Sequence, residues 1–281
     1  MRLEHPIFKG PLAPKLDLGS IDTPADYRSG PGGKDLPAKM ESWRVQTGKF
    51  PDEVDVGLVS SPYGFEDSPD TEWISSGVNS KGPRSVALGR HGNFFLWGFA
   101  GDPSQMTESG RRVFVNAVAY MKKFDGKTPL VSPISQSRDL ALLYTQYLAK
   151  YANADWLKKM YPEEVRKSTG LDAAKIEAYY SENLEYVRVV DGAFAVDPDA
   201  KTLGVSNRKP AILDRILARL AEDEKDALAW RLVKNYFERT FDGAAEFRAW
   251  VEANRTWLFF SDVGGYKWFV DHHAKRGAGA R

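Results

Sequence analysis

Apolar positions change their spacing along the chain, and the change predicts two regions of different structure. In the first half the apolar residues form short runs, at 54–59, 85–89 and 93–99, with the length and the β-branched or aromatic content of strands. His91 and Gly92 lie between the second and third runs, at the spacing of a hairpin turn. We therefore predict a β-sheet in this part of the chain.

A helix is predicted to follow the sheet. Thr107 can cap its first turn, and apolar residues then recur every three or four positions from Val113 to Met121. Gly126 follows as a stop signal, since glycine commonly ends helices. The spacing predicts a helix of about 16 residues, which together with the strands gives an α/β fold for the front part.

Beyond a proline-containing linker, over residues 127–136, the apolar spacing becomes helical. Two aromatic runs near the C-terminus flank Gly264 and Gly265, which predicts one closing hairpin. No period recurs along this part, so no internal repeat is expected. The predicted helices fall within residues 140–151, 162–170, 172–187, 210–220, 228–236 and 247–254.

These patterns divide the chain into two expected domains. Residues 1–128 would form an α/β domain with a Pro- and Gly-rich arm of about 50 residues packed on it, longer than an ordinary loop. Residues 135–281 would form an all-α, bundle-like domain that ends in the C-terminal hairpin. A chain of 281 residues is long enough for two such domains.

Composition narrows the classes of function. The formal net charge is +1 and neither half has an excess of one sign, which argues against nucleic acid as a partner. There are no cysteines, so disulfides, thiolate metal sites and cysteine nucleophiles are excluded. No apolar run approaches the roughly 20 residues that span a bilayer, so we expect a soluble chain with no membrane partner. The expected compartment is the cytoplasm for the chain as given, or an extracytoplasmic one if a preceding segment carries a signal.

The densest group of chemically interesting residues lies within residues 62–73. Four carboxylates, Glu66, Asp67, Asp70 and Glu72, fall close together there. Because clustered carboxylates repel, a folded protein must hydrate them, pair them or bind a cation. One interpretation is a sugar site in which these carboxylates act as acid and base. The favoured alternative is a solvated turn whose charges are structural.

Three further residues belong to the sugar-site interpretation. His91 titrates near neutral pH and would lie near the carboxylates, while Trp73 and Trp97 would offer surfaces on which a sugar stacks. The place of His91 at a turn is also explained by local geometry, since histidine tolerates unusual backbone angles. The chain has no metal-binding or cofactor-binding motif, so neither a metal nor a cofactor is expected.

Three other segments are interpreted as structural. Residues 197–204 depart from a calcium loop, because Lys201 stands at a ligand position, and are interpreted as a turn before a helix. The adjacent His272 and His273 are poor joint ligands and are expected at the surface. The aromatic residues near the C-terminus are expected in the core, and a homodimer would follow if they were exposed instead.

Two stretches of the front part resemble a known family. His5-Pro6-Ile7-Phe8 and the block from Ser85 to Phe99, followed by the helix that contains Asn116-Ala117, resemble the second half of the class I glutamine-amidotransferase-like fold, in particular its ThuA-like (trehalose-utilisation-type) members. The resemblance covers residues 1–125 and implies a partial flavodoxin-like or amidotransferase-like sheet. The first half of that fold is absent, which suggests that Met1 is an internal start of a longer protein. The nucleophilic cysteine is also missing, so amidotransferase activity is excluded.

The helical part brings no activity with it. Asn207-Arg208-Lys209 and the segment from Ser261 to Tyr266 resemble only bacterial proteins of unassigned activity. The leading hypothesis is a non-catalytic structural or binding module, related to carbohydrate-associated α/β domains, with a carbohydrate or another protein as its partner. The alternative is a carbohydrate-active enzyme that uses the carboxylates of residues 66–72 as acid and base.

Overall fold

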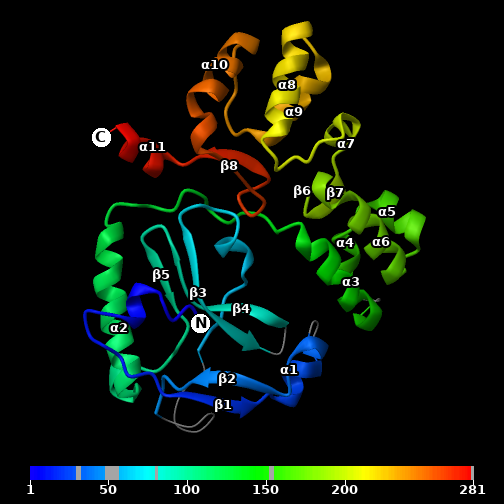
Figure 1. Ribbon diagram of the computed structural model, residues 1–281. Helices are drawn as coiled ribbons and strands as arrows, with labels where there is room; N and C mark the ends of the chain where they lie inside the picture. Colours follow the sequence, from blue (N-terminus) through cyan, green and yellow to red (C-terminus); the bar gives the residue numbers. More distant parts are fainter. Residues whose placement is uncertain (30–32, 48–56, 80–81, 152–154, 280–281) are drawn as a thin grey trace. The chain divides into compact units, whose positions relative to one another are not determined.

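The computed structural model describes residues 1–29, 33–47, 57–79, 82–151 and 155–279 (Figure 1). The chain divides into two compact units, Met1–Glu66 with Asp70–Pro129, and Asp67–Pro69 with Leu130–Arg281. Small antiparallel sheets and helices make the fold a mixed α/β one, as the spacing of apolar residues predicts.

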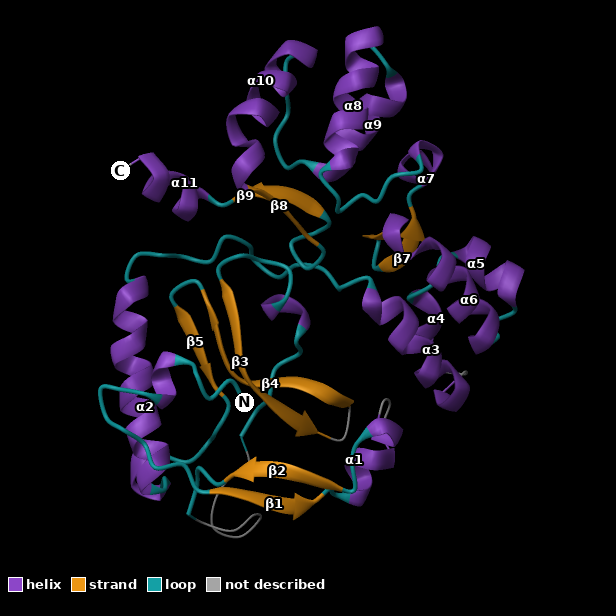
Figure 2. Cartoon of the chain, viewed as in Figure 1, coloured by secondary structure: helices purple, strands orange, loops and turns teal. Residues whose placement is uncertain are grey.

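The first unit contains a three-stranded antiparallel sheet with the strand order β3-β4-β5 (Figure 2). The strands predicted at 85–89 and 93–99 correspond to β4 and β5. Gly92, with a φ of 56°, lies in the turn between them, and this left-handed backbone angle suits glycine. The predicted hairpin is therefore confirmed. The three strands span Thr71–Asn79 (β3), Gly82–His91 (β4) and Phe94–Trp97 (β5).

The sequence does not predict β3, and it predicts another strand that is not found. The residues of β3 are mostly polar, so their pattern is typical of a loop, and pairing with β4 is what stabilises them as a strand. The predicted strand at 54–59 lies partly outside the described residues. Its described part forms no strand, and the following Ser60 makes only an isolated bridge with Val86.

Helix α2 (Glu108–Met121) supplies the first unit with one wall of its core and confirms the predicted helix. The Thr107 hydroxyl caps it by accepting a hydrogen bond from the Gly110 N–H at 3.1 Å. Its buried face packs with residues of the sheet and of the N-terminal arm. This core contains Ile7, Phe8, Ile74, Leu88, Val113 and Ala117.

The N-terminal arm is anchored to α2 by one buried amide. Asn116, which is fully buried, donates from Nδ2 to the carbonyls of Ile7 and Leu12, both at 2.8 Å. Its Oδ1 accepts from the Leu12 N–H at 2.8 Å, so the amide is saturated. The arm also contains elements that the sequence does not predict, namely β1 (Leu18–Asp22), α1 (Ala25–Ser29) and β2 (Lys39–Trp43), with β1 and β2 paired antiparallel.

The described part of the second unit combines helices with two β-hairpins, so the all-α prediction is wrong there. The C-terminal hairpin was expected, but Val187, predicted to end a helix, begins a strand because the preceding helix already ends at Asn183. No helix in this or the other described part of the chain is long and apolar enough to cross a bilayer. The elements are α3 (Asp139–Tyr151), α4 (Asp155–Lys159), α5 (Glu163–Thr169), α6 (Ala173–Asn183), β6 (Val187–Val190), β7 (Ala193–Val196), α7 (Pro198–Leu203), α8 (Ala211–Glu222), α9 (Ala227–Tyr236), α10 (Ala244–Asn254), β8 (Leu258–Ser261), β9 (Lys267–Val270) and α11 (His272–Gly279).

One arrangement of elements occurs twice in the second unit. Helices α6 and α10 both have 11 residues, begin with Ala-Ala and end with asparagine. Each leads through a three-residue 3₁₀ turn into a hairpin of two four-residue strands, and a further helix follows. We call residues 173–203 the first module and residues 244–279 the second module.

An asparagine–lysine pair occupies the same place in both modules. Lys201 Nζ donates to Asn183 Oδ1 in the first module, and Lys275 Nζ donates to Asn254 Oδ1 in the second, both at 2.7 Å. Each asparagine also donates from Nδ2 to the carbonyl four residues earlier in its helix, again at 2.7 Å in both modules. The pair therefore ties the end of the long helix to the helix that follows the hairpin.

An aspartate after each hairpin makes a second set of matching contacts. The backbone N–H of Asp197 donates to the Tyr186 carbonyl at 2.9 Å, and that of Asp271 to the Trp257 carbonyl at 2.8 Å. Each carboxylate accepts from the N–H of the alanine three residues later and so caps the next helix. The prediction of no internal repeat is wrong. The two hairpin turns differ in length, so the asparagine and lysine are 18 residues apart in one module and 21 in the other.

Candidate functional site

The four carboxylates predicted as one cluster lie in different surroundings. Glu66 is exposed and follows the 3₁₀ turn Tyr63–Phe65, whereas Asp67 belongs to the second unit. Asp70 immediately precedes β3, and Glu72 lies in that strand. Proximity in the sequence therefore does not give these groups common partners.

Glu72 is saturated by donors from other elements of the first unit. Arg90 on β4 donates from Nε to Glu72 Oε2 at 2.8 Å, and the Tyr120 hydroxyl of α2 donates to Oε1 at 2.8 Å. Burial by itself would raise the pKa of Glu72, but the nearby His5 and the hydrogen bonds from Arg90 and Tyr120 outweigh it and lower the pKa to about 2. Glu72 is thus an anion at any ordinary pH and cannot serve as a general acid.

His5 also contacts this network. Its Nδ1 accepts from the Ile7 N–H at 3.4 Å, and its Nε2 lies 3.6 Å from Glu72 Oε2. Arg90 is held in turn by the Gly92 carbonyl, at 2.9 Å from Nη1, and by the Phe124 ring beneath its guanidinium, at 3.8 Å.

Asp70 and His91 lie close together. The sugar-site interpretation places His91 near the carboxylates, and Asp70 is the one that it contacts. Asp70 Oδ1 lies 3.6 Å from His91 Nε2, and the two side chains are 9% and 16% exposed. Burial lowers the pKa of His91; Asp70 opposes this shift and Arg90 reinforces it. His91 is therefore mostly neutral at neutral pH, the form in which an imidazole can accept a proton.

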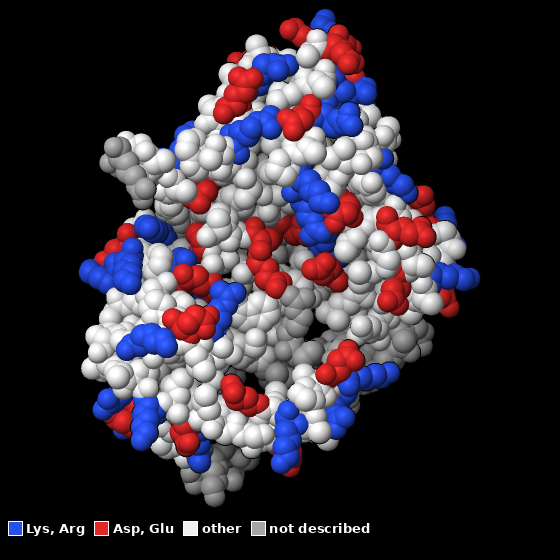
Figure 3. Space-filling model, viewed as in Figure 1, with Lys and Arg blue, Asp and Glu red and all other residues white. Residues whose placement is uncertain are grey.

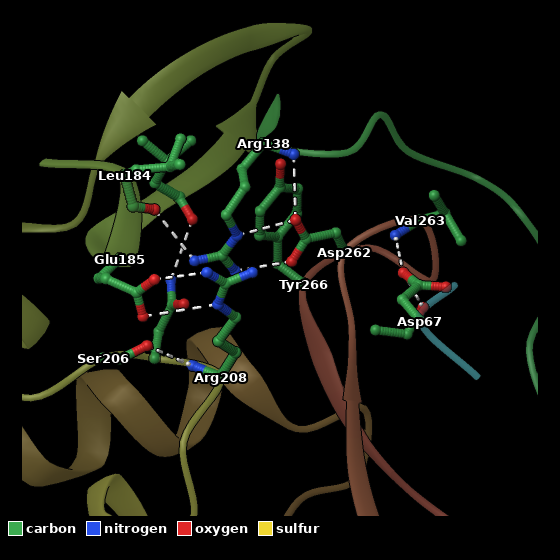
Figure 4. A network of polar contacts seen from close by, with 12 residues as sticks. Asp67, Arg138, Leu184, Glu185, Ser206, Arg208, Asp262, Val263 and Tyr266 are labelled. Carbon is green, nitrogen blue, oxygen red and sulfur yellow. Dashed lines mark hydrogen bonds and ion pairs between the residues drawn. The ribbon is translucent and has the colours of Figure 1, made fainter. Parts of the chain in front are cut away.

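Asp67 contacts the hairpin loop of the second module (Figure 4). Its Oδ2 accepts from the Ser261 hydroxyl and from the Val263 N–H, both at 3.0 Å. Burial raises the pKa of Asp67 to about 6; the neighbouring Asp262 adds to the shift, and the two hydrogen bonds partly offset it. Asp67 thus titrates well above an ordinary aspartate.

Arg138 is a fully buried charge of the second unit that sequence reasoning missed. Its guanidinium is fully buried and binds Asp262 in bidentate geometry, with Nε–Oδ2 at 2.8 Å and Nη2–Oδ1 at 2.6 Å (Figure 4). Its Nη1 donates to the Leu184 carbonyl at 3.1 Å, and an ion pair between Glu185 and Arg208 lies beside it. The partners of Arg138 are up to 124 residues away in sequence, so no local pattern could reveal them.

The two tryptophans proposed as sugar platforms are partly buried. Trp97 packs edge-on against Phe99 and Phe114, with ring centroids 5.2 Å away in both cases, and belongs to the rim of the core. Trp73 lies in β3, opposite Gly89 of β4. The Trp97 ring therefore contributes to packing in the first unit.

Other residues singled out in the sequence have structural surroundings. Asp197 caps α7, which explains the resemblance to a calcium loop as helix capping. Tyr266 and Trp268 are buried, as expected for core aromatics, so they do not form the exposed surface on which the homodimer hypothesis depended. His272 is exposed and stands beside His273, with ring centroids 4.4 Å apart.

Exposed aromatic side chains occur instead in the first half of the second unit. Trp156 of α4 is 50% exposed and Tyr151 of α3 is 47% exposed. Tyr144 packs edge-on against Trp156, at 6.1 Å between centroids, and against Tyr147, at 6.2 Å. We call Tyr144, Tyr147, Tyr151 and Trp156 the aromatic surface.

The charged side chains of the described residues form no metal site and no large patch of one sign on the visible face (Figure 3). Acidic and basic side chains alternate on the visible face (Figure 3), and no three His, Cys, Asp or Glu residues among those described could hold a metal ion. A depression of about 510 Å³ lies at the start of α2, but Arg112 there pairs with Glu108 at 2.7 Å and Arg44 donates to the Gln46 and Thr47 carbonyls. It is lined by Lys15, Asp17, Arg44, Thr107, Glu108, Ser109 and Arg112.

Comparison of the chain with models of protein families, with curated proteins and with solved structures gives no match.

Proposed function

We propose that this chain is a non-catalytic binding module. The observation that carries the proposal is that the candidate carboxylates have different partners: Asp67 accepts from Ser261 and Val263, while Glu72 accepts from Arg90 and Tyr120. A pair of carboxylates that cleaves a glycosidic bond must face the same bond, at a separation of roughly 5 to 9.5 Å, with one member able to carry a proton. Glu72, with its low pKa, cannot be the member that carries the proton, and Asp67, whose pKa is raised to about 6, is held by Ser261 and Val263 instead.

A relation to ThuA-like, flavodoxin-like domains is part of the proposal. Support comes from the buried contact of Asn116 with Ile7, because these residues lie in the two segments that carry the resemblance. The same contact explains both signatures physically, as an anchor for the N-terminal arm. A module that keeps this anchor and lacks a nucleophile is consistent with a binding role.

We propose the aromatic surface as the place where a ligand binds, and a carbohydrate as the ligand class. Trp156 and Tyr151 present half-exposed rings, and such rings stack well on the apolar faces of sugars. The nearly balanced charge of the chain favours an uncharged ligand over a polyanion.

Titration of soluble oligosaccharides against the purified chain, followed by isothermal calorimetry, tests this function. We expect binding without hydrolysis, and at least a tenfold loss of affinity in Trp156→Ala. Phe94→Ala is the matched control, because Phe94 is an exposed aromatic residue of the first unit. Equal affinity in the two variants and the parent chain would place binding elsewhere, and release of reducing sugar would contradict the non-catalytic proposal.

The pair Asp70–His91 favours a second candidate, a carbohydrate-active enzyme. Asp70 Oδ1 lies 3.6 Å from His91 Nε2, within ion-pair distance, and a contraction of a few tenths of an ångström would give the hydrogen bond by which a carboxylate orients a histidine base. His91→Gln would then abolish turnover and leave the melting temperature within a few degrees of the parent. A hydrolytic activity that survives this substitution would exclude the pair from catalysis.

A further inference from the structure

The turns of the two module hairpins differ, although their strands match. β6 and β7 are joined by Asp191 and Gly192, with φ values of 49° and 80°. β8 and β9 are joined by five residues, from Asp262 to Tyr266, which we call the long loop. The first module forms its hairpin with two turn residues, so the hairpin itself does not require the longer turn of the second module. The contacts of the long loop therefore indicate its role.

The long loop binds the chain that precedes α3. The Val263 carbonyl accepts from the N–H groups of Ile134 and Ser135 at 2.8 and 2.9 Å, and the Tyr266 hydroxyl donates to the Gln136 carbonyl at 2.8 Å. A Cβ on Gly264 would lie 2.5 Å from Val131 Cγ1, so only glycine allows this close approach.

The same loop also binds a short segment from far earlier in the sequence. Asp67–Pro69 belongs to the second unit, although the residues on both sides of it, Glu66 and Asp70, belong to the first. Hydrogen bonds from the Ser261 hydroxyl and the Val263 N–H to Asp67 Oδ2 hold this segment. One carboxylate oxygen thus receives both donors.

The other oxygen of Asp67 is buried without a hydrogen-bond donor among the described residues. A buried carboxylate oxygen without a donor is costly when charged and much less so when protonated. The charged and titratable groups around Asp67 do not lower the free-energy cost of ionising its buried carboxyl. Asp262 repels the charge, and the guanidinium of Arg138 is already bound to Asp262.

Two further groups near Asp67, Tyr266 and Asp139, do not stabilise its negative charge. Burial raises the pKa of Tyr266 far above its usual value, and its hydroxyl is a donor to the Gln136 carbonyl. Asp139, at the start of α3, raises the pKa of Tyr266 as Asp262 and Asp67 do, so its charge has the same sign as that of Asp67. Asp67 is therefore the group through which pH can act on this contact.

We propose that the long loop is a pH-sensitive clasp, which holds Asp67–Pro69 while the Asp67 carboxyl is protonated and loosens its hold as that carboxyl ionises. The pKa of Asp67 in the folded chain, about 6, lies above its usual value of 3.8. The contact is accordingly at full strength below about pH 4 and weakens as the pH rises through 6. A shift of about two pKa units corresponds to roughly a hundredfold change in the equilibrium between held and released states.

Amide hydrogen exchange of Val263, followed by NMR in the full chain at pH 4.5 and pH 7.5 and corrected for the intrinsic rate, tests the clasp. In the parent chain we expect protection to fall between ten- and a hundredfold over this range. Asp67→Asn keeps an acceptor oxygen without a titrating group, so its protection should be high and independent of pH. Asp67→Ala removes the acceptor, so its protection should be low at both pH values.

The melting curve of each variant shows whether it is folded, and the amide of Phe194 in the first module serves as an internal reference, since it donates to the Met160 carbonyl far from Asp67 in sequence. The proposal is overturned if the parent and Asp67→Asn share one pH profile, or if Asp67→Ala retains the protection of the parent at pH 4.5. Neither outcome depends on whether the chain binds a sugar.

Discussion

The two modules of the second unit share their frame and differ in their turns. In both, a lysine binds the asparagine at the end of the long helix, and an aspartate caps the helix after the hairpin. Only the long loop of the second module binds Asp67 and faces Arg138 through Asp262. Residues common to both modules therefore have structural roles, whereas residues particular to one are where a specific role should be sought.

The largest expected effect comes from breaking the buried ion pair of the second module. Arg138→Ala leaves the Asp262 carboxylate buried without its cation, which typically costs about 3 to 5 kcal/mol of the free energy of unfolding. Asp191→Asn, at the corresponding turn of the first module, should change that free energy by less than about 0.5 kcal/mol. Urea denaturation of both variants measures the difference. Similar effects in the two variants would mean that the modules do not differ in the way described.

The pH dependence of stability gives the next largest effect. Because folding raises the pKa of Asp67 from 3.8 to about 6, this carboxyl stabilises the folded state least above pH 6 and most below pH 4. Asp67→Asn should therefore be more stable than the parent chain at pH 7.5, by up to about 3 kcal/mol, with the difference vanishing near pH 4. Melting temperatures across this pH range provide the measurement. A variant less stable than the parent at pH 7.5 would reverse the assigned sign.

The shared frame predicts a smaller effect that should be equal in both modules. Lys201→Met and Lys275→Met each remove the donor to a partly buried asparagine oxygen, at a typical cost of about 1 to 3 kcal/mol. Chemical denaturation of the two single variants and of the double variant measures the cost and its additivity. If one lysine proves neutral and the other essential, the contacts would be similar in geometry but not in role.

Local patterns predict much of the fold. The spacing of apolar residues predicts α2, the β4–β5 hairpin and most helices of the second unit. It does not predict β3, whose polar residues form a strand because β4 pairs with them. The spacing of apolar residues also does not reveal the repeat, because the two modules share the positions of their contacts and not a constant sequence period.

The candidate site was less predictable than the fold. The sequence places Glu66, Asp67, Asp70 and Glu72 close together, but the partner of each is set by tertiary structure. Glu72 meets Arg90 through strand register, whereas Asp67 meets Ser261, 194 residues away. Glu72 lies in β3 and is held by Arg90, so the predicted solvated turn does not describe its surroundings, and the pairing of Asp70 with His91 keeps the enzymatic alternative testable.

Measurement of individual carboxyl pKa values by NMR tests most directly whether the carboxylates of residues 66–72 are committed to partners within the protein. The contacts described here predict that Glu72 is still ionised at pH 3.5 and that Asp67 titrates near pH 6. Values near 4 for both groups would mean that they are hydrated and available, and would contradict the account.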